Sequence, residues 1–288
     1  MRFIRATLLA LVAALAIGCD KAEPIGGETP KHSNKNVISL SPSTTEFIGQ
    51  YALNPTILKG RTQSCNYPPN MLNVPAVCSV KPDYERIASM KPDLIVYDAA
   101  LFSQSDIDKL KQAAPGATIL EFKANSIDEY IDSAYRLGVA VESASRFSEY
   151  LDKVYAKSRV GRSNPPDPKP KFAVLLAGGG EYMVAGTEGF LADAIRSAGA
   201  EPVGPKSTKF ETMPVEALIE ANPDLIVVAD DASPILKDPR LASIRAIKDK
   251  SVEVLKGDVL LRAGVRVDKM IEKFTALANA RSAAMAPQ

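Results

Sequence analysis

The sequence contains little of what most catalytic and metal sites require. It has one histidine, His32, three cysteines and no tryptophan among 288 residues. His32 lies in a polar N-terminal stretch, where a lone histidine is usually solvated rather than a ligand. The remainder of the chain therefore lacks histidine for Ser-His-Asp or Cys-His catalysis and for a histidine-rich zinc or manganese site. We predict no catalytic site, no metal site and no cofactor.

The sequence also lacks an excess of either charge. Its 35 basic residues nearly balance its 34 acidic residues, so bulk charge does not favour nucleic acid or a membrane surface as the partner. The hydrophobic content of 46% is enough to fill two cores of ordinary domain size. A ligand must therefore be inferred from local features.

Only the N-terminus contains a long apolar run. Arg2 and Arg5 precede the stretch 6–17, which is too short to cross a bilayer but is typical of a secretory signal. The run ends in Gly18 and Cys19, an ending similar to a bacterial lipobox in which the cysteine is lipidated. We predict a signal peptide over 1–19, a lipid anchor at Cys19 as the sole membrane attachment, and a flexible tether over 20–35. Simple cleavage of the signal is the alternative.

One segment of the sequence occurs twice. The run ERIASMKPDLIV at Glu85–Val96 returns as EALIEANPDLIV at Glu216–Val227, with the glutamate, proline, aspartate and four apolar residues in the same register. Such a repeat predicts two similar lobes, and a site between them is the first candidate for function.

Strand-like and helix-like segments alternate along both halves, which predicts α/β lobes with central, mainly parallel sheets. We place the lobes at 36–125 and 170–283 and expect Glu46 in the first turn of a helix, where its charge suits the dipole. Apolar residues recur every three to four positions over 126–163, which predicts one long connecting helix, with Gly138 as a candidate break. Clustered prolines follow and end it. A helical connection predicts limited hinge motion between the lobes.

Several motifs together carry a family resemblance. They are VISLSPSTTE at Val37–Glu46, CNYPP at Cys65–Pro69, the two PDLIV units, GTEGFLADAIRSAGAE at Gly186–Glu201 and RAGVR at Arg262–Arg266. With these motifs the chain resembles the periplasmic substrate-binding proteins of ABC importers for cobalamin, haem and ferric siderophores. The resemblance implies two α/β lobes joined by one long helix, and a monomer that captures a chelate in the periplasm and delivers it to an inner-membrane permease dimer.

In that family, one surface glutamate on each lobe docks with arginines of the permease. The matching residues are Glu85 and Glu216, which lead the two repeats. Paired carboxylates suit a two-fold permease, where charge contacts steer and orient docking. The simpler interpretation is that each is an acidic residue favoured in the first turn of its helix.

We expect the ligand in a cleft at the carboxyl ends of the strands. Aromatic and polar residues in the corresponding loops are the candidates, and for each aromatic the alternative is core packing. Arg262 is expected to pair with a carboxylate, phosphate or catecholate, with Asp258 orienting it. The predicted ligand-binding residues are Tyr67, Asp98, Phe102, Tyr182, Phe210, Asp258 and Arg262.

The identity of the cargo is less constrained. Cobalamin-binding relatives often stack the corrin on tryptophans, and residue matching places Ser79, Asp98 and Phe210 at three such positions. The Cys-x-Tyr-Pro-Pro loop nevertheless resembles the corrinoid branch. Haem needs an axial ligand, for which Tyr67, Tyr182, another tyrosine or a methionine is available. We rank a corrinoid first, a ferric siderophore second and haem third.

Two other functions are weighed against transport. The glycine run 178–180 follows a strand but lacks the spacing and the Lys-Ser/Thr of a nucleotide-binding loop, so an enzyme is not predicted. A ligand-free envelope lipoprotein that binds another protein through its lobes is the alternative to a receptor.

Cys65 and Cys78 bound a short, proline-rich loop of a chain that we expect to be exported. In an oxidising compartment this favours a disulfide, which would contribute about 3 kcal/mol by loop entropy. A two-cysteine metal site and free thiols are the alternatives.

Overall fold

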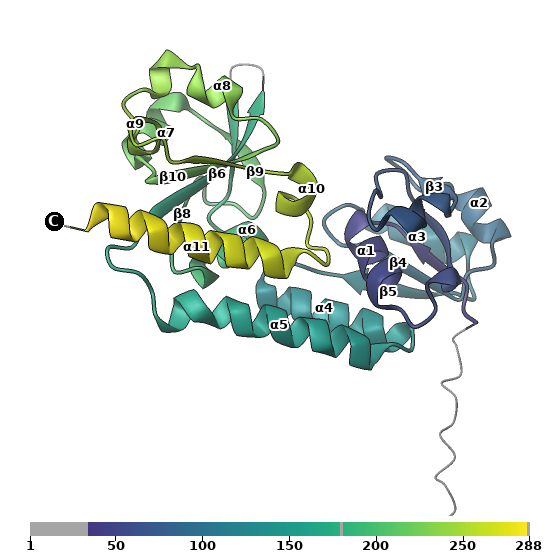
Figure 1. The fold of residues 1–288 in the computed structure, drawn as a ribbon. Coiled ribbons are helices and arrows are strands. Elements are labelled where there is room, and N and C mark those ends of the chain that lie inside the picture. Colours follow the sequence, from purple (N-terminus) through teal and green to yellow (C-terminus); the bar gives the residue numbers. More distant parts are fainter. Residues whose placement is uncertain (1–33, 179–180, 287–288) are drawn as a thin grey trace, which may run out of the picture. The chain divides into compact units, whose positions relative to one another are not determined.

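A computed structural model of the chain describes residues 34–178 and 181–286 (Figure 1). The predicted signal peptide, Cys19, His32 and nearly all of the predicted tether lie outside these residues, as does part of the glycine run. Within the described ranges, no helix has the length and hydropathy that a membrane crossing requires.

The first lobe is built on a five-stranded, fully parallel sheet in the order β3-β2-β1-β4-β5. Its strands are β1 (Val37–Ser39), β2 (Leu58–Thr62), β3 (Ala76–Cys78), β4 (Leu94–Asp98) and β5 (Thr118–Phe122). Its helices are α1 (Pro42–Tyr51), α2 (Tyr84–Ser89) and α3 (Gln104–Ala113), with 3-10 turns η1 (Pro55–Ile57) and η2 (Pro69–Asn73). β4 is apolar and buried along nearly all its length, as expected for a parallel strand covered on both faces.

The second lobe has a mixed sheet in the order β11-β10-β6-β7-β9, with β8 paired to β6. Its strands are β6 (Lys171–Gly178), β7 (Glu181–Ala185), β8 (Glu201–Val203), β9 (Phe210–Met213), β10 (Leu225–Ala229) and β11 (Val252–Leu255). Its helices are α6 (Phe190–Ser197), α7 (Val215–Ala221), α8 (Ser233–Leu236), α9 (Arg245–Lys248), α10 (Gly257–Leu260) and α11 (Val267–Met285), with the turn η3 (Pro239–Leu241). β7 runs antiparallel to both β6 and β9. The prediction of mainly parallel α/β lobes is confirmed, although β7 and β9 were not anticipated.

The sequence repeat corresponds to a structural repeat. Each copy forms a helix followed by a strand, α2 with β4 and α7 with β10. The two strands have equivalent places in their sheets: β4 lies between β1 and β5, and β10 lies between β6 and β11. The aspartate of each copy fixes the first strand: Asp93 Oδ2 accepts the Asn36 N–H at 2.7 Å, and Asp224 Oδ2 accepts the Lys171 N–H at 2.8 Å. The repeated aspartate therefore has the same structural role in both lobes, because it holds the start of the first strand next to the repeat.

The connection between the lobes consists of two helices, α4 (Ile127–Ala140) and α5 (Ala144–Ser163). The break is at Glu142, whose φ of 57° is left-handed, and not at Gly138, which lies inside α4. The Ser143 N–H bonds to the Gly138 carbonyl at 2.7 Å and the Glu142 N–H to the Val139 carbonyl at 3.0 Å, the pattern of a Schellman helix end. Gly138 is needed for packing, because a Cβ there would lie 2.7 Å from the Phe147 ring.

These helices carry the chain back and forth between the lobes. The first N–H of α4, at Ile127, bonds to Asp193 of α6 at 2.8 Å, and Arg162 near the end of α5 pairs with the same carboxylate at 2.5 Å. The turn between the helices instead contacts the first lobe, where the Leu53 N–H bonds to Ser143 Oγ at 2.9 Å. The chain therefore passes between the lobes three times, through the segment after β5, through α4 and through α5.

The lobes also share a hydrophobic core. One continuous cluster of buried apolar residues joins Phe47 and Phe122 of the first lobe, Phe147 of α5, and Phe172 and Phe274 of the second lobe. In Figure 1, α4, α5 and α11 lie side by side. A shared core and a three-pass connection both oppose wide hinge motion.

Candidate functional site

A cavity of about 820 Å³ lies between the two lobes. The first lobe contributes the segments that follow β4 and β5, residues 98–103 and 123–125, together with Ser43. The second lobe contributes the segment from the end of β7 into α6, residues 208–210, and residues of the segment after α10. On the first lobe this is the predicted position, the carboxyl ends of parallel strands.

Three of the predicted ligand-binding residues, Asp98, Phe102 and Phe210, line this cavity. A third ring, Phe190 at the start of α6, was not predicted although it lies in the quoted GTEGF motif. Buried tyrosines hold two of the rings in place: Tyr97 packs edge-on against Phe102 at a centroid distance of 6.3 Å, and Tyr130 lies 5.6 Å from Phe190. The cavity therefore presents aromatic surfaces in fixed positions.

The polar groups of the cavity are few. Asp98 is half-buried, and burial raises the pKa of its carboxyl although the Ala100 N–H, at 2.9 Å, opposes the rise. Among the described residues, Asp98 has no ion-pair partner within 4 Å. Lys123, which pairs with Glu121 at 2.9 Å, and the exposed Lys209 contribute positive charge from opposite lobes. Asp98 and the exposed Glu188 balance them, so the charged lining residues do not favour either sign. Such a site combines apolar contact with a small number of orienting polar groups.

Tyr182, another predicted ligand-binding residue, does not line the cavity. Alternate residues of β7 point to opposite faces, so Tyr182 and Val184 are buried in the core of the second lobe while Met183 is exposed. The Tyr182 hydroxyl donates to Asp238 at 2.7 Å. Burial and this hydrogen bond raise the pKa of Tyr182 to about 12. Tyr182 is therefore a core residue, which was the alternative considered for each aromatic candidate.

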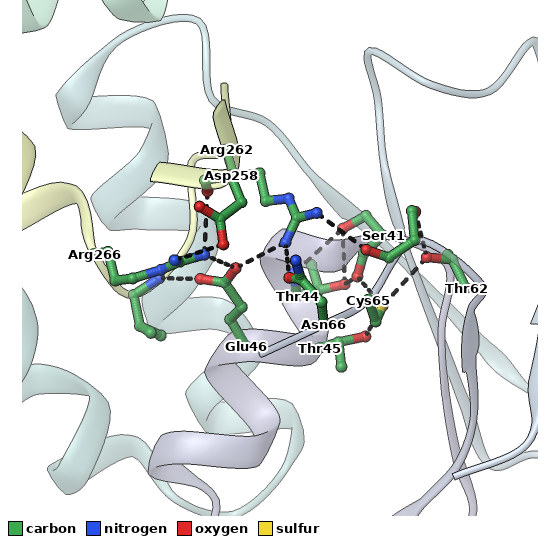
Figure 2. Close-up of polar contacts among 12 residues, drawn as sticks. Ser41, Thr44, Thr45, Glu46, Thr62, Cys65, Asn66, Asp258, Arg262 and Arg266 are labelled. Atoms are coloured by element: carbon green, nitrogen blue, oxygen red, sulfur yellow. Dashed lines mark hydrogen bonds and ion pairs between the residues drawn. The ribbon is translucent and has the colours of Figure 1, made fainter. Parts of the chain in front are cut away.

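Arg262 and Asp258 are not among the residues that line the cavity. Figure 2 shows them in a group of charged side chains with Glu46 and Arg266. Arg262 donates to the Asn66 side chain at 2.5 Å and to the Ser64 carbonyl at 3.0 Å. Asp258 pairs with Arg266 at 2.9 Å and not, as expected, with Arg262. Burial would raise the pKa of Asp258, but the hydrogen bond and charge of Arg266 outweigh it and lower the pKa. Tyr67 lies beneath Arg266, whose guanidinium carbon is 4.7 Å from the ring centroid.

Glu46 is the centre of this charged group and was missed as a site residue. Its side chain is 1% exposed, and it accepts hydrogen bonds from Arg266 at 2.7 Å, from the Val265 N–H at 3.2 Å and from Arg262 at 3.5 Å. The expectation that Glu46 lies in the first turn of its helix, where its charge would suit the dipole, is wrong: α1 begins at Pro42, so Glu46 lies in the second turn. The motifs that carry the family resemblance include both Glu46 and Arg266, but sequence gives no sign that they meet.

The two predicted docking residues occupy equivalent positions. Glu85 and Glu216 are each the second residue of a helix, α2 and α7, and both are exposed. Neither carboxylate has an ion-pair partner within 4 Å among the described residues. Both are therefore accessible to a partner, although a favourable interaction with the helix dipole is also present.

The predicted disulfide is absent. Cys65 and Cys78 are buried free thiols. The Cys65 sulfur contacts the hydroxyls of Thr45 at 3.1 Å and Thr62 at 3.2 Å, whereas the Cys78 sulfur is directed to the Ser79 carbonyl at 3.7 Å. Burial raises the pKa of Cys78 to about 11. Each thiol thus has polar partners of its own. No group of three or more potential metal ligands occurs in the described part of the chain.

Comparison with known proteins gives the class to which this arrangement belongs. The model of the periplasmic binding protein family matches residues 37–259. YvrC of Bacillus subtilis (strain 168), an uncharacterized ABC transporter substrate-binding lipoprotein, is 24% identical over 255 residues, covering 85% of this chain and 80% of the relative. The vitamin B12-binding protein of Salmonella choleraesuis (strain SC-B67) is 26% identical over 207 residues, covering 70% of this chain and 74% of that protein.

Among solved structures, the periplasmic haem-binding protein BhuT in complex with two haems matches with a TM-score of 0.74 at 20% identity. The match covers 86% of this chain and 99% of that chain, and it shows a shared fold. The chain belongs to the periplasmic binding protein family. It is a substrate-binding component of a transport system and not an enzyme.

Proposed function

We propose that this protein captures a corrinoid in the cavity between its lobes and delivers it to an ABC permease of the inner membrane. The observation that carries the proposal is the composition of the cavity wall. Phenylalanine rings from both lobes line it, and its described lining residues include no histidine, tyrosine, methionine or cysteine. Haem iron would lack an axial protein ligand here, whereas a corrinoid such as cyanocobalamin brings axial ligands of its own and needs none from the cavity wall.

The relatives support the transport role and leave the cargo open. One relative is named for vitamin B12, and a protein of the same fold was solved with haem. A ferric siderophore is the second candidate, because Lys123 and Lys209 can each pair with an anionic group of a chelate, although Asp98 and Glu188 balance their charge. Export to the periplasm and lipid attachment at Cys19 complete the proposal, and the protein acts as a monomer.

Cargo binding is tested by calorimetric titration of cyanocobalamin, cobinamide, haemin and several ferric siderophores into one preparation. We expect one-to-one, sub-micromolar binding of cyanocobalamin or cobinamide. Phe102→Ala should weaken it by about tenfold, because loss of one ring contact costs about 1.4 kcal/mol. Tyr182→Phe, outside the cavity, is the matched control and should change affinity little. Binding of haemin alone would overturn the corrinoid assignment, and binding of no probe would favour a ligand-free interaction protein.

Docking is tested separately from cargo binding. Glu85→Gln combined with Glu216→Gln should greatly slow cargo uptake through the cognate permease in proteoliposomes while leaving cargo affinity unchanged. Docking charges act mainly on association, so the remaining uptake should lose its sensitivity to salt. Glu220→Gln is the control, because Glu220 is an exposed glutamate of α7 outside the repeated position. Normal uptake by the double variant would exclude this docking role.

A further inference from the structure

Beside the cavity, one group of charged residues joins the two lobes directly. We call Glu46, Arg262 and Arg266 the inter-lobe latch (Figure 2). Glu46 belongs to α1 of the first lobe, one turn after Ser43, which lines the cavity. The arginines belong to the segment between α10 and α11 of the second lobe, where the flanking residues Leu261 and Ala263 line the opposite wall. The latch therefore connects the two walls at the edge of the cavity.

The Glu46–Arg266 part of the latch is removed from water. The Glu46 side chain is 1% exposed and that of Arg266 is 20% exposed, and the two are 2.7 Å apart. Such a pair is little affected by salt, and loss of one member leaves an uncompensated buried charge. The second guanidinium nitrogen of Arg266 is held by Asp258, and its buried Nε has no partner among the described residues. If the lobes separate, Arg266 keeps Asp258 of its own lobe, whereas Glu46 loses both of its arginine partners.

The backbone of the second lobe is fitted closely to the Glu46 carboxylate. A Cβ at Gly264 would lie 2.2 Å from Glu46 Oε2, so any other residue at 264 would displace the carboxylate from its present position. The Val265 N–H bonds to the same oxygen at 3.2 Å, and the Gly264 carbonyl accepts a bond of 2.7 Å from the Tyr130 hydroxyl of α4. Backbone and side-chain contacts thus fix one spacing between the lobes at this point.

The Arg262 part of the latch is held less tightly to Glu46 than the Arg266 part is. The Arg262 side chain is 18% exposed and lies 3.5 Å from Glu46, while its stronger bonds go to Asn66 and the Ser64 carbonyl. Water or a ligand group can replace these two bonds at lower cost than the buried pair. The latch thus has a fixed member, Arg266, and an exchangeable member, Arg262.

The geometry points to a positioning role for Glu46: through Arg266 and Arg262 it sets the width of the cleft, and the cleft opens only when this carboxylate is separated from the arginines. The width itself does not depend on which cargo is bound. Its consequence for cargo rests on the proposed function, because a wider cleft releases a bound corrinoid faster.

A purely structural ion pair would stabilise the fold without setting the distance between the lobes. Asp224 and Arg245 provide that comparison within the second lobe, where a carboxylate that is 3% exposed pairs with an arginine at 2.5 Å. Asp224→Asn should therefore lower thermal stability and leave the lobe spacing unchanged, whereas Glu46→Gln should change both.

The spacing is measured by dipolar spectroscopy between spin labels at Gln112→Cys of α3 and Lys248→Cys of α9, two exposed positions on different lobes. The full chain carries Cys19→Ser, and the buried native thiols do not take up label. We expect a narrow distribution for the parent protein and for Asp224→Asn. Glu46→Gln should give a broader distribution centred at a longer distance. A Glu46→Gln distribution that matches the parent would overturn the latch.

Arg262→Gln and Arg266→Lys keep the test decisive if Glu46→Gln does not fold. Arg266→Lys keeps the charge but not the fork-shaped contact, so it should broaden the distribution. Arg262→Gln should broaden the distance distribution less than Arg266→Lys does.

With cyanocobalamin as the probe, the dissociation rate should rise about tenfold in Glu46→Gln. Failure of the parent to bind cyanocobalamin would count against the proposed cargo and leave the spacing measurement intact, whereas unchanged spacing in all three variants would reject the latch alone.

Discussion

Asp98 is a half-buried carboxyl on the cavity wall whose pKa is raised by burial. Its folded-state pKa therefore lies above the unfolded value of about 3.9. At neutral pH the folded protein holds a charge that the unfolded chain accommodates more easily, which lowers stability. As pH falls through the folded pKa the native state takes up the proton and this cost disappears.

We therefore expect Asp98→Asn to stabilise the protein at pH 7 and to lose that advantage near pH 4, as measured by urea denaturation midpoints at both pH values. Asp231→Asn is the control of opposite sign. The pKa of Asp231 is lowered by hydrogen bonds from Ser233, whose N–H lies 2.8 Å away, so that variant should be less stable than the parent at pH 7. Destabilisation by Asp98→Asn at pH 7 would show that its carboxylate has a favourable partner.

At the residue level, the sequence predicted which residues lie at the cavity better than it predicted which side chains pair with one another. Asp98 and Phe102 follow a recognisable buried strand, so their place at the cavity was predictable. Tyr182 was assigned to a loop because it follows a run of glycines, which is typical of a turn. It lies in β7, where alternate side chains point to opposite faces of the sheet, and its own side chain points into the core. The Glu46–Arg266 pair was not predictable, because no local pattern links residues 220 positions apart.

The turn between α4 and α5 places a non-glycine residue in a conformation that favours glycine. Glu142 has a φ of 57°, which costs roughly 1 kcal/mol for a residue with a Cβ. Its ion pair with Lys35, at 3.2 Å, is exposed on both sides and contributes little.

Glu142→Gly should therefore raise the free energy of unfolding by about 0.5 to 1 kcal/mol, measured by urea denaturation. Glu142→Gln separates the two effects, since it removes the ion pair and retains the Cβ, and it should be neutral or slightly destabilising. Equal losses in both variants would mean that the ion pair, and not the backbone, determines stability at this turn.

Elements with a continuous apolar run or a clear helical period were the predictable ones. The two PDLIV units, which end at Val96 and Val227, lead into β4 and β10, and each strand extends two residues beyond its unit. The break in the connecting helices was placed at glycine because glycine lowers helix propensity, but packing against Phe147 retains Gly138 within α4. Tertiary contact overrode local preference at that position.

The whole molecule is predicted to unfold in one step. Both lobes contribute to one buried apolar cluster, and α4 and α11 each pack against α5. Separate melting of a lobe would expose that shared core. We expect a single calorimetric transition whose measured enthalpy equals the van't Hoff enthalpy, with coincident far-ultraviolet circular dichroism and tyrosine fluorescence curves. Two resolved transitions would indicate independent cores.

The distance along the chain between the members of the latch has a consequence for biosynthesis. Translation produces Glu46 220 residues before Arg266. During that interval the first lobe possesses a carboxylate that its own sequence leaves without these counter-ions, so α1 cannot reach its final buried environment. Only when the segment before α11 emerges does the earliest-made lobe become complete. Ribosomes that stop before Arg266 would therefore release chains in which Glu46 cannot be paired and the N-terminal half is unfinished.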